Sequence, residues 1–163
     1  MKRKDMAGFL FVSILGTALH FLYDWTGGNL LAGLVSGVNE SVWEHMKLLF
    51  MASFLWFFLT RGDWFADGAG LLAGLALIPV VYYTYTGALG YRVTAVDISL
   101  FYVAAALMFA VRRRLRRREA SPGLQTAALM ALVVVCVAFF VWTLYPPHFP
   151  LWQDPVSGGY GVA

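Results

Sequence analysis

Five apolar stretches, each long enough to cross a lipid bilayer as a helix, constrain this chain more than any other feature. They cover residues 6–24, 40–60, 67–86, 93–112 and 124–144. A helix needs about 20 mostly apolar residues to cross the hydrocarbon core, and a segment in lipid must satisfy its backbone hydrogen bonds internally. The sequence therefore predicts an all-α integral membrane protein, a single domain over residues 1–163 with five transmembrane helices.

The overall composition favours the same class. Hydrophobic residues make up 60% of the chain, the mean hydropathy is +0.69, and only 13% of the residues are charged, against about 25% in soluble domains. The first apolar stretch is too long for a typical signal-peptide core, so we expect a retained first helix. The single cysteine, Cys136, excludes an intrachain disulfide.

Basic residues give the expected orientation. Ten of the 12 lysines and arginines fall on one side of a five-helix topology: Lys2, Arg3, Lys4, Arg61, Arg112, Arg113, Arg114, Arg116, Arg117 and Arg118. The positive-inside rule assigns that side to the cytoplasm, with the N-terminus inside and the C-terminus outside. We interpret the arginine run as a topology signal that contacts lipid phosphates, and we expect no nucleic-acid partner.

Ionisable residues gather on the opposite, outer side. They include all three histidines and five of the nine acids, and His20 and Asp97 fall inside expected helices. An ionisable residue within a membrane span is by default a candidate functional residue. We therefore expect one polar chamber near the outer surface. The inner halves of the spans, by contrast, show no ionisable residues, which argues against a continuous transport path.

The stretch GVNESVWEHMKLLF, residues 37–50, opens the second span. Helical spacing puts Glu40, Glu44 and Lys47 on one face, with His45 about 100° round from Glu44. A structural role remains open, because Ser41 and Glu44 fit a capping box and Asn39 is a good N-cap.

Three other segments have local signatures. Residues 29–38 are too short to span, and we expect a half-helix before the second span. Gly33 with Gly37, and Gly70 with Gly74, are G-x-x-x-G pairs that permit close helix packing. The proline-rich tail, residues 145–163, carries too many aromatic residues for a disordered segment, and we predict that it folds back over the outer mouth as a lid.

The chain resembles a family of small prokaryotic multi-pass membrane proteins. The resemblance rests on NESVWEHMK and on the tail HFPLWQDPVSGGYG, which match an N-E-S-x-W-E-H-x-K motif and a C-terminal D-P-V-x-G-x-Y-G segment. It covers the whole chain and implies the cytoplasmic (inner) membrane of a prokaryote. The family carries no assigned activity, so the resemblance implies no mechanism.

The leading functional hypothesis is a metal-dependent, hydrolase-like membrane enzyme acting on a lipid or cell-envelope substrate. Imidazole and carboxylate groups suit Zn²⁺ or another divalent metal. The candidate metal ligands are His20, Asp24, His45, His148 and Asp154; the candidate catalytic groups are Glu40, Glu44, Lys47 and Asp97; the candidate substrate contacts are Asn39, Trp43, Tyr83 and Trp152. Glu44 is the expected general base for a metal-bound water.

Two other classes remain open. A transporter or proton-coupled carrier would use Asp97, Glu44 and His20 as relay or cation-binding groups. A non-catalytic module would bind a cation or a small molecule at the acidic outer cluster. Membrane lipid and a lipid or small-molecule ligand are the expected partners, and a homodimer is an open arrangement. Metal content would favour the enzyme, and liposome flux the transporter.

Overall fold

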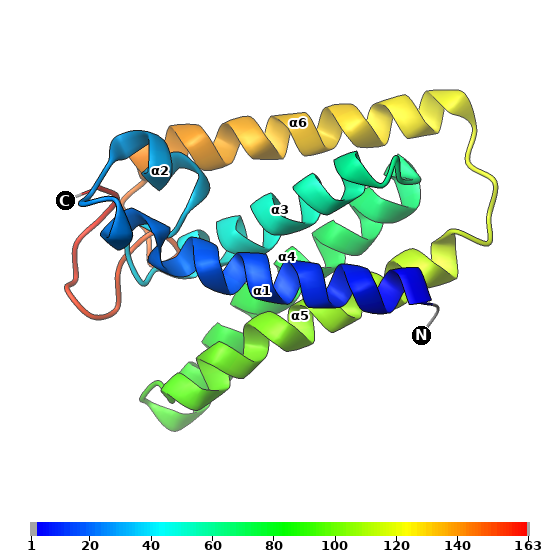
Figure 1. Cartoon of the computed structure of the whole chain (residues 1–163). Coiled ribbons are helices and arrows are strands. Elements are labelled where there is room, and N and C mark those ends of the chain that lie inside the picture. The colour runs from blue at the N-terminus through cyan, green and yellow to red at the C-terminus, as the bar shows by residue number, and fades with distance from the viewer. Residues whose placement is uncertain (1–2, 163) are drawn as a thin grey trace.

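The computed structural model describes residues 3–162, and every long element in that range is a helix (Figure 1). The six helices are α1 (Arg3–Trp25), α2 (Leu30–Val35), α3 (Val42–Leu59), α4 (Trp64–Leu89), α5 (Thr94–Leu115) and α6 (Pro122–Leu144). Five of them, all except α2, are long and apolar enough to cross a membrane. The expectation of an all-helical chain with five such helices is confirmed, whereas orientation and membrane insertion stay predictions.

Side-chain caps set several helix boundaries. Ser41 accepts a hydrogen bond from the Glu44 amide at 3.3 Å and begins α3, and Asp63 and Ser121 cap α4 and α6 in the same way. The left-handed Gly90, with φ of 77°, ends α4, as glycine commonly does after a helix. The second span therefore begins two residues later than the expected range 40–60, and Glu40 lies before the helix.

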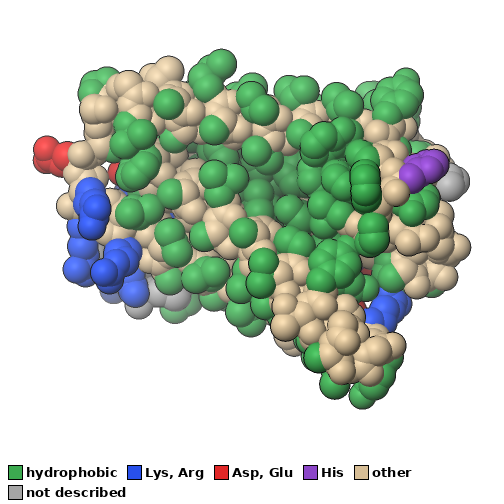
Figure 2. Space-filling view, turned by 180° about the vertical axis from the view of Figure 1, so that it is seen from behind, with side chains coloured by type: hydrophobic (Ala, Val, Ile, Leu, Met, Phe, Trp, Pro, Cys, Tyr) green, Lys and Arg blue, Asp and Glu red, His purple; other side chains and the backbone are tan. Residues whose placement is uncertain are grey.

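The centre of the bundle is α3, which contacts all the other helices. Its buried residues Leu48, Leu49, Phe50 and Phe57 lie at the heart of the apolar core. Figure 2 shows the reverse surface, where hydrophobic side chains cover the broad middle and most of the visible lysines and arginines gather at one end. Such a belt is what a lipid-facing surface requires.

The helices α4 and α5 form an antiparallel hairpin with very close packing. A side chain at Gly70 would come within 2.6 Å of the Met108 carbonyl oxygen, and one at Gly74 within 2.9 Å of the Ala104 carbonyl oxygen. Both glycines of this G-x-x-x-G pair thus serve helix packing. The tip of the hairpin diverges from the rest of the bundle in Figure 1.

The two ends of the bundle differ in character. We call the end where α1 finishes, α3 begins and residues 145–162 lie the tail end, and the opposite end, where α5 finishes, the arginine end. At the tail end, α2 is the short helix expected within residues 29–38, reduced to six residues and capped by Asn29. Over residues 145–162 the tail has no helix, and its one bridge joins Gln153 and Tyr160.

Candidate metal centre

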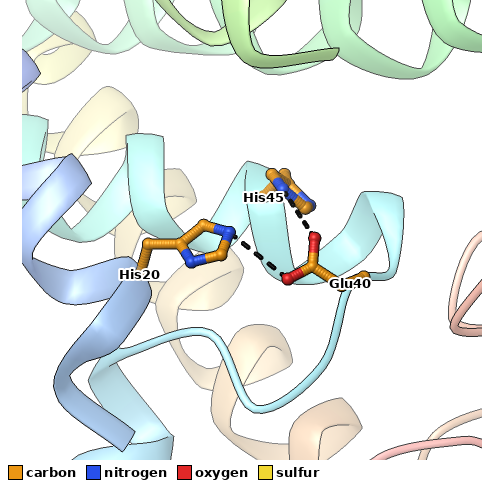
Figure 3. A group of neighbouring side chains, drawn as sticks. All are labelled: His20, Glu40 and His45. Carbon is orange, nitrogen blue, oxygen red and sulfur yellow. Dashed lines mark ion pairs between the residues drawn. The ribbon is translucent and has the colours of Figure 1, made fainter. Parts of the chain in front are cut away.

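Two histidines and one glutamate from separate elements meet at the tail end (Figure 3). His20 lies on the last turns of α1, His45 on the first turn of α3, and Glu40 in the loop before α3. The Glu40 carboxylate lies between the two rings, with its oxygens 3.5 Å from His20 Nε2 and 3.7 Å from His45 Nε2. One ligand atom from each residue falls within 4.8 Å of the others, so a single ion can contact all three.

The tautomer of His45 is set by its own helix. Its Nδ1 lies 2.9 Å from the Ser41 carbonyl oxygen, an acceptor that requires a hydrogen on Nδ1. A neutral His45 therefore presents the lone pair of Nε2 to the Glu40 carboxylate. A backbone carbonyl bound to the second ring nitrogen is the usual arrangement behind a metal-binding histidine.

Electrostatics at Glu40 follow from the same contacts. The hydrogen bond with His20 is the largest cause that lowers the pKa of Glu40 below its ordinary value, with further contributions from the charges of His45, His20 and Arg92. Partial burial opposes this shift, because desolvation disfavours the charged form. Since the Glu40 side chain is still 43% exposed, the carboxylate remains ionised and reachable.

An apolar pocket of about 470 Å³ opens beside the cluster. It lies between α1 and α3 on one side and the diverging α4–α5 hairpin on the other, and Val156 from the tail contributes to its lining. Leu48, Ile78 and Phe101 form part of its apolar wall. Its charged and imidazole-bearing lining residues are His20, Glu40, His45, Arg92 and Asp97. The volume is in the range of pockets that enclose small ligands.

Asp97 lines this pocket from α5, but its carboxylate already has a partner. The Tyr85 hydroxyl donates a short hydrogen bond to Asp97 Oδ1, and the same hydroxyl accepts one from the Val93 amide at 3.2 Å. The two bonds fix the carboxylate at the start of α5. Asp97 therefore shares the pocket with the histidines without contacting them directly.

Glu44 and Lys47, two of the candidate catalytic residues, lie in a different and closed network. Their side chains are 3% and 0% exposed, and Lys47 Nζ is 2.5 Å from Glu44 Oε2. Lys47 also donates to the Gly33 carbonyl and to Thr143 Oγ1, both at 2.8 Å. Glu44 in turn accepts from Thr143 at 3.0 Å and from the Val38 amide at 3.1 Å. The network joins α3 to α2 and α6, and the structure does not bring Glu44 to the histidine cluster.

Glu40, Glu44 and Lys47 therefore do not share one helical face as expected. Glu40 precedes the first residue of α3, Val42, so its direction follows the loop and not the helical period. The capping box is also incomplete. Ser41 Oγ accepts from the Glu44 amide, but the Ser41 amide donates to Asn39 Oδ1 at 2.9 Å, while the Glu44 carboxylate bonds elsewhere.

The remaining candidate metal ligands are placed differently. His148 is exposed and stacks on Tyr160, with ring centroids 4.6 Å apart. Asp154 is only 8% exposed and closes its own turn, accepting from the Val156 amide at 2.7 Å and the Ser157 hydroxyl at 2.8 Å. Asp24 lines a small side cavity together with His20, Glu40 and His45. Of these three, only Asp24 adjoins the cluster.

The candidate substrate contacts lie outside the lining of the apolar pocket, although Asn39 lines the small side cavity beside the cluster. The rings of Trp43 and Trp152 are tilted by 36° with centroids 5.2 Å apart, in an aromatic group that includes Phe139 and Trp142. Asn39 donates to the Gly161 carbonyl at 3.0 Å and so secures the tail. Tyr83 is exposed, whereas its neighbour Tyr82 lines the pocket. Sequence reasoning located the correct end of α4 but not the tyrosine that faces the pocket.

The arginine end holds a buried ionic group that the sequence did not reveal. Arg112 bonds Asp5 at 2.8 Å and also Asp67, and none of the three is more than 5% exposed. The guanidinium also lies over the rings of Phe57 and Phe109, at 5.4 and 5.7 Å. The expectation that the inner halves of the spans lack ionisable residues is wrong. In the sequence, Arg112 is one of a run of arginines, and only its position on the helical face of α5 that is buried distinguishes it from the others.

The fold and this cluster define a class: an all-helical protein with five helices long and apolar enough to cross a membrane, and with a His–Glu–His group beside an apolar pocket. More specifically, the chain belongs to the family of unknown function DUF6512, whose model matches residues 2–162. Comparison with curated proteins gave no match, and neither did comparison with solved structures.

Proposed function

We propose that this chain is a divalent-metal membrane enzyme of the hydrolase type, with its metal held by His20, Glu40 and His45. The observation that carries the proposal is the convergence of three ligand atoms within 4.8 Å from three separate elements. Two imidazoles and a carboxylate are a common ligand set for catalytic Zn²⁺, which keeps a further coordination position open. The apolar pocket beside the cluster offers that position a substrate.

The chemistry of such a site is hydrolysis of an ester or phosphoester. A metal held by His20, Glu40 and His45 would lower the pKa of a water bound to it and would polarise the oxygen of the scissile group. The water attacks the carbon or phosphorus, the bond to the leaving oxygen breaks, and that oxygen takes up the proton that the water gives up. We assign the proton transfer to Asp97, since it lines the same pocket and Glu44 is enclosed by its own partners.

The membrane orientation supports an outward-facing site. The basic residues of 112–118 lie at the arginine end, which the positive-inside rule assigns to the cytoplasm. The tail end then faces outward, in the inner membrane of a prokaryote. The tail acts as the lid of the site, because Leu151 accepts a hydrogen bond from the Trp43 amide at 3.0 Å and Val156 lines the pocket.

The test is metal content. Protein purified in mild detergent and loaded with Zn²⁺ should retain about one ion per chain, measured by mass spectrometry after gel filtration. His45→Ala should lose the ion, and so should Glu40→Gln. His148→Ala is the matched control, because His148 is an exposed histidine outside the cluster, and it should retain the ion. Equal metal content in His148→Ala and His45→Ala would overturn the proposal.

A cation-binding module without catalysis rests on the same three residues and predicts the same metal content. Turnover separates the two: only the enzyme releases product from a lipid ester or phosphoester, and only with the metal bound. Failure to hydrolyse any member of an ester and phosphoester lipid panel, with the ion present, would favour the binding module.

A further inference from the structure

The pocket has an uneven distribution of polarity that points to one kind of ligand. Its charged and imidazole-bearing lining residues come from the last turns of α1, the loop before α3 and its first turn, the turn between α4 and α5, and the start of α5. The lining deeper in the pocket is mostly apolar, with Leu48 on α3, Ile78 on α4 and Leu100 and Phe101 on α5. Its two deeper polar side chains, Thr17 and Tyr102, bond each other through their hydroxyls at 3.0 Å. A ligand that fits must be polar at one end and a hydrocarbon along the rest.

Arg92 sets the charge of the polar end. It lies in the turn between α4 and α5, lines the pocket and remains exposed. Within residues 3–162 it has no ion-pair partner, unlike Arg112 at the other end of the bundle. A guanidinium recognises phosphate and carboxylate through paired N–H donors, and an unpaired one beside a ligand pocket is available for an anion.

The net charge at the polar end of the pocket depends on whether a metal ion is bound. Without an ion, the charges of Glu40 and Asp97 exceed that of Arg92 by one, and an anionic ligand is disfavoured. With a divalent ion and neutral histidines, positive charge exceeds negative by one. Metal and guanidinium together form the kind of clamp that stabilises a phosphoryl group. Headgroup binding and metal binding are therefore coupled, and each must strengthen the other by the same factor.

Lateral access suits a ligand that already resides in the membrane. Phe21 on α1 and Ile98 on α5 both line the pocket, yet they are 45% and 57% exposed at the apolar surface of the bundle. A hydrocarbon chain can pass between these two residues from the bilayer without crossing water. The pocket volume of about 470 Å³ belongs to the smaller half of ligand pockets, which favours one chain over two.

We propose that the pocket binds a single-chain lipid phosphate, with its phosphate between Arg92 and the metal and its chain along Leu48, Ile78 and Phe101. This rests on the proposed function, since the metal supplies part of the phosphate site. The substrate class is accordingly a monoacyl or prenyl phosphate ester, whose phosphate lies beside the site of water activation.

Binding of two probes tests the proposal. Oleoyl monoacylglycerol phosphate and the uncharged oleoyl monoacylglycerol are titrated into Zn²⁺-loaded and chelator-treated protein in the same detergent. The phosphate probe should bind the loaded form at least about tenfold more tightly than the chelated form, as typical couplings between sites predict. The uncharged probe should bind both forms equally and more weakly than the phosphate probe.

Variants locate the two halves of the ligand. Arg92→Gln should weaken the phosphate probe by about 10- to 100-fold, the worth of one charge-assisted hydrogen bond, and should leave the uncharged probe and the metal content unchanged. Ile98→Trp narrows the pocket from an exposed position and should weaken both probes. Inorganic phosphate should compete only at far higher concentration than the lipid.

The failures are distinguishable. Full metal content with no preference for the phosphate probe, or an Arg92→Gln variant that binds it normally, overturns the lipid-phosphate proposal and leaves the metal enzyme standing. Inorganic phosphate that competes as well as the lipid excludes a role for the apolar pocket. If the purified protein retains no metal, the proposed function is overturned. If, in addition, the phosphate probe binds equally well with and without chelator, the coupling between metal and headgroup is overturned too.

Discussion

Ionisable groups lie on two sides of the start of α3, and the two sides differ in burial, in hydrogen-bond partners and in access to the pocket. On one side Glu44 and Lys47 are almost wholly buried, and their charges and hydrogen bonds are matched within the network. On the other, His45 and Glu40 are partly exposed and border a pocket, and the Glu40 oxygens lie 3.5 Å from His20 and 3.7 Å from His45. One short motif thus serves two purposes.

Whether its polar atoms are already satisfied separates a structural polar group from a candidate functional one in this bundle. A buried ion pair that is fully satisfied has no capacity left for a ligand, and removing either partner leaves an uncompensated charge. A cluster with loosely placed ligand atoms and solvent access keeps that capacity. Substitutions on the first side should therefore affect folding, and substitutions on the second should affect binding.

The largest expected effect is on the buried side. Lys47→Ala leaves Glu44 as a buried charge without its partner, and it should lower the free energy of unfolding by about 3–5 kcal/mol, measured by denaturant titration in detergent. Glu44→Gln combined with Lys47→Met removes both charges and should lose much less. A Lys47→Ala loss no greater than that of the double variant would contradict the closed network.

Metal binding should come next in size. Zn²⁺ at a free concentration about 100 times its dissociation constant should stabilise the wild-type protein by about 2.7 kcal/mol, seen as a rise in the unfolding midpoint. Glu40→Gln should show no such rise at the same concentration, although its stability without metal should be close to wild type, because Glu40 is half-exposed. An identical rise in both proteins would show that Glu40 does not help to bind the ion.

Ser41 contacts both sides and should have a smaller effect. Its hydroxyl caps α3 through the Glu44 amide, while its carbonyl orients His45. Ser41→Ala removes only the cap and should cost about 1 kcal/mol in denaturant titrations. The carbonyl remains, so the metal content should not change. A Ser41→Ala variant that folds but loses the ion would show that the two sides are not independent.

The smallest expected effect is the dependence of stability on pH. The pKa of Glu40 is lowered in the folded protein, chiefly by its hydrogen bond with His20. The unfolded state therefore binds the proton first, and the resulting stabilisation is complete above the ordinary value of 4.5 and is lost as pH falls through the lower folded pKa. Metal-free wild type should show this loss, and Glu40→Gln should not. Parallel curves of unfolding free energy against pH for the two proteins would contradict this assignment of the effect to Glu40.

Much of the fold was predictable because hydrophobic length sets it. Apolar stretches gave the number of long helices, and the apolar run before the second span gave α2. Depth was predictable in the same way, so His20 and His45 were placed at one level. The direction in which each side chain points was not predictable, because it depends on the exact first residue of α3. Glu40 lies off the helical face for that reason, and its carboxylate is found between the two histidines.

Partners between distant segments were the other limit. Thr143 is one threonine in an apolar helix, and nothing in its neighbourhood indicates that it bridges Glu44 and Lys47. His148 and Asp154 were expected at the cluster because the tail was expected to fold back. The tail does contact α3 and the pocket, but its turn geometry uses Asp154 locally.

The hydrogen bond from Asn39 to Gly161 joins residues 122 positions apart. A ribosome adds about 5–20 residues per second, so the loop that carries Glu40 waits on the order of ten seconds for its brace. During that interval the long helices can already form while the loop that carries Glu40 lacks its contact with the tail. That contact is therefore completed late in biogenesis, and a protease that removed the tail would release the Glu40 loop without cutting any of the six helices.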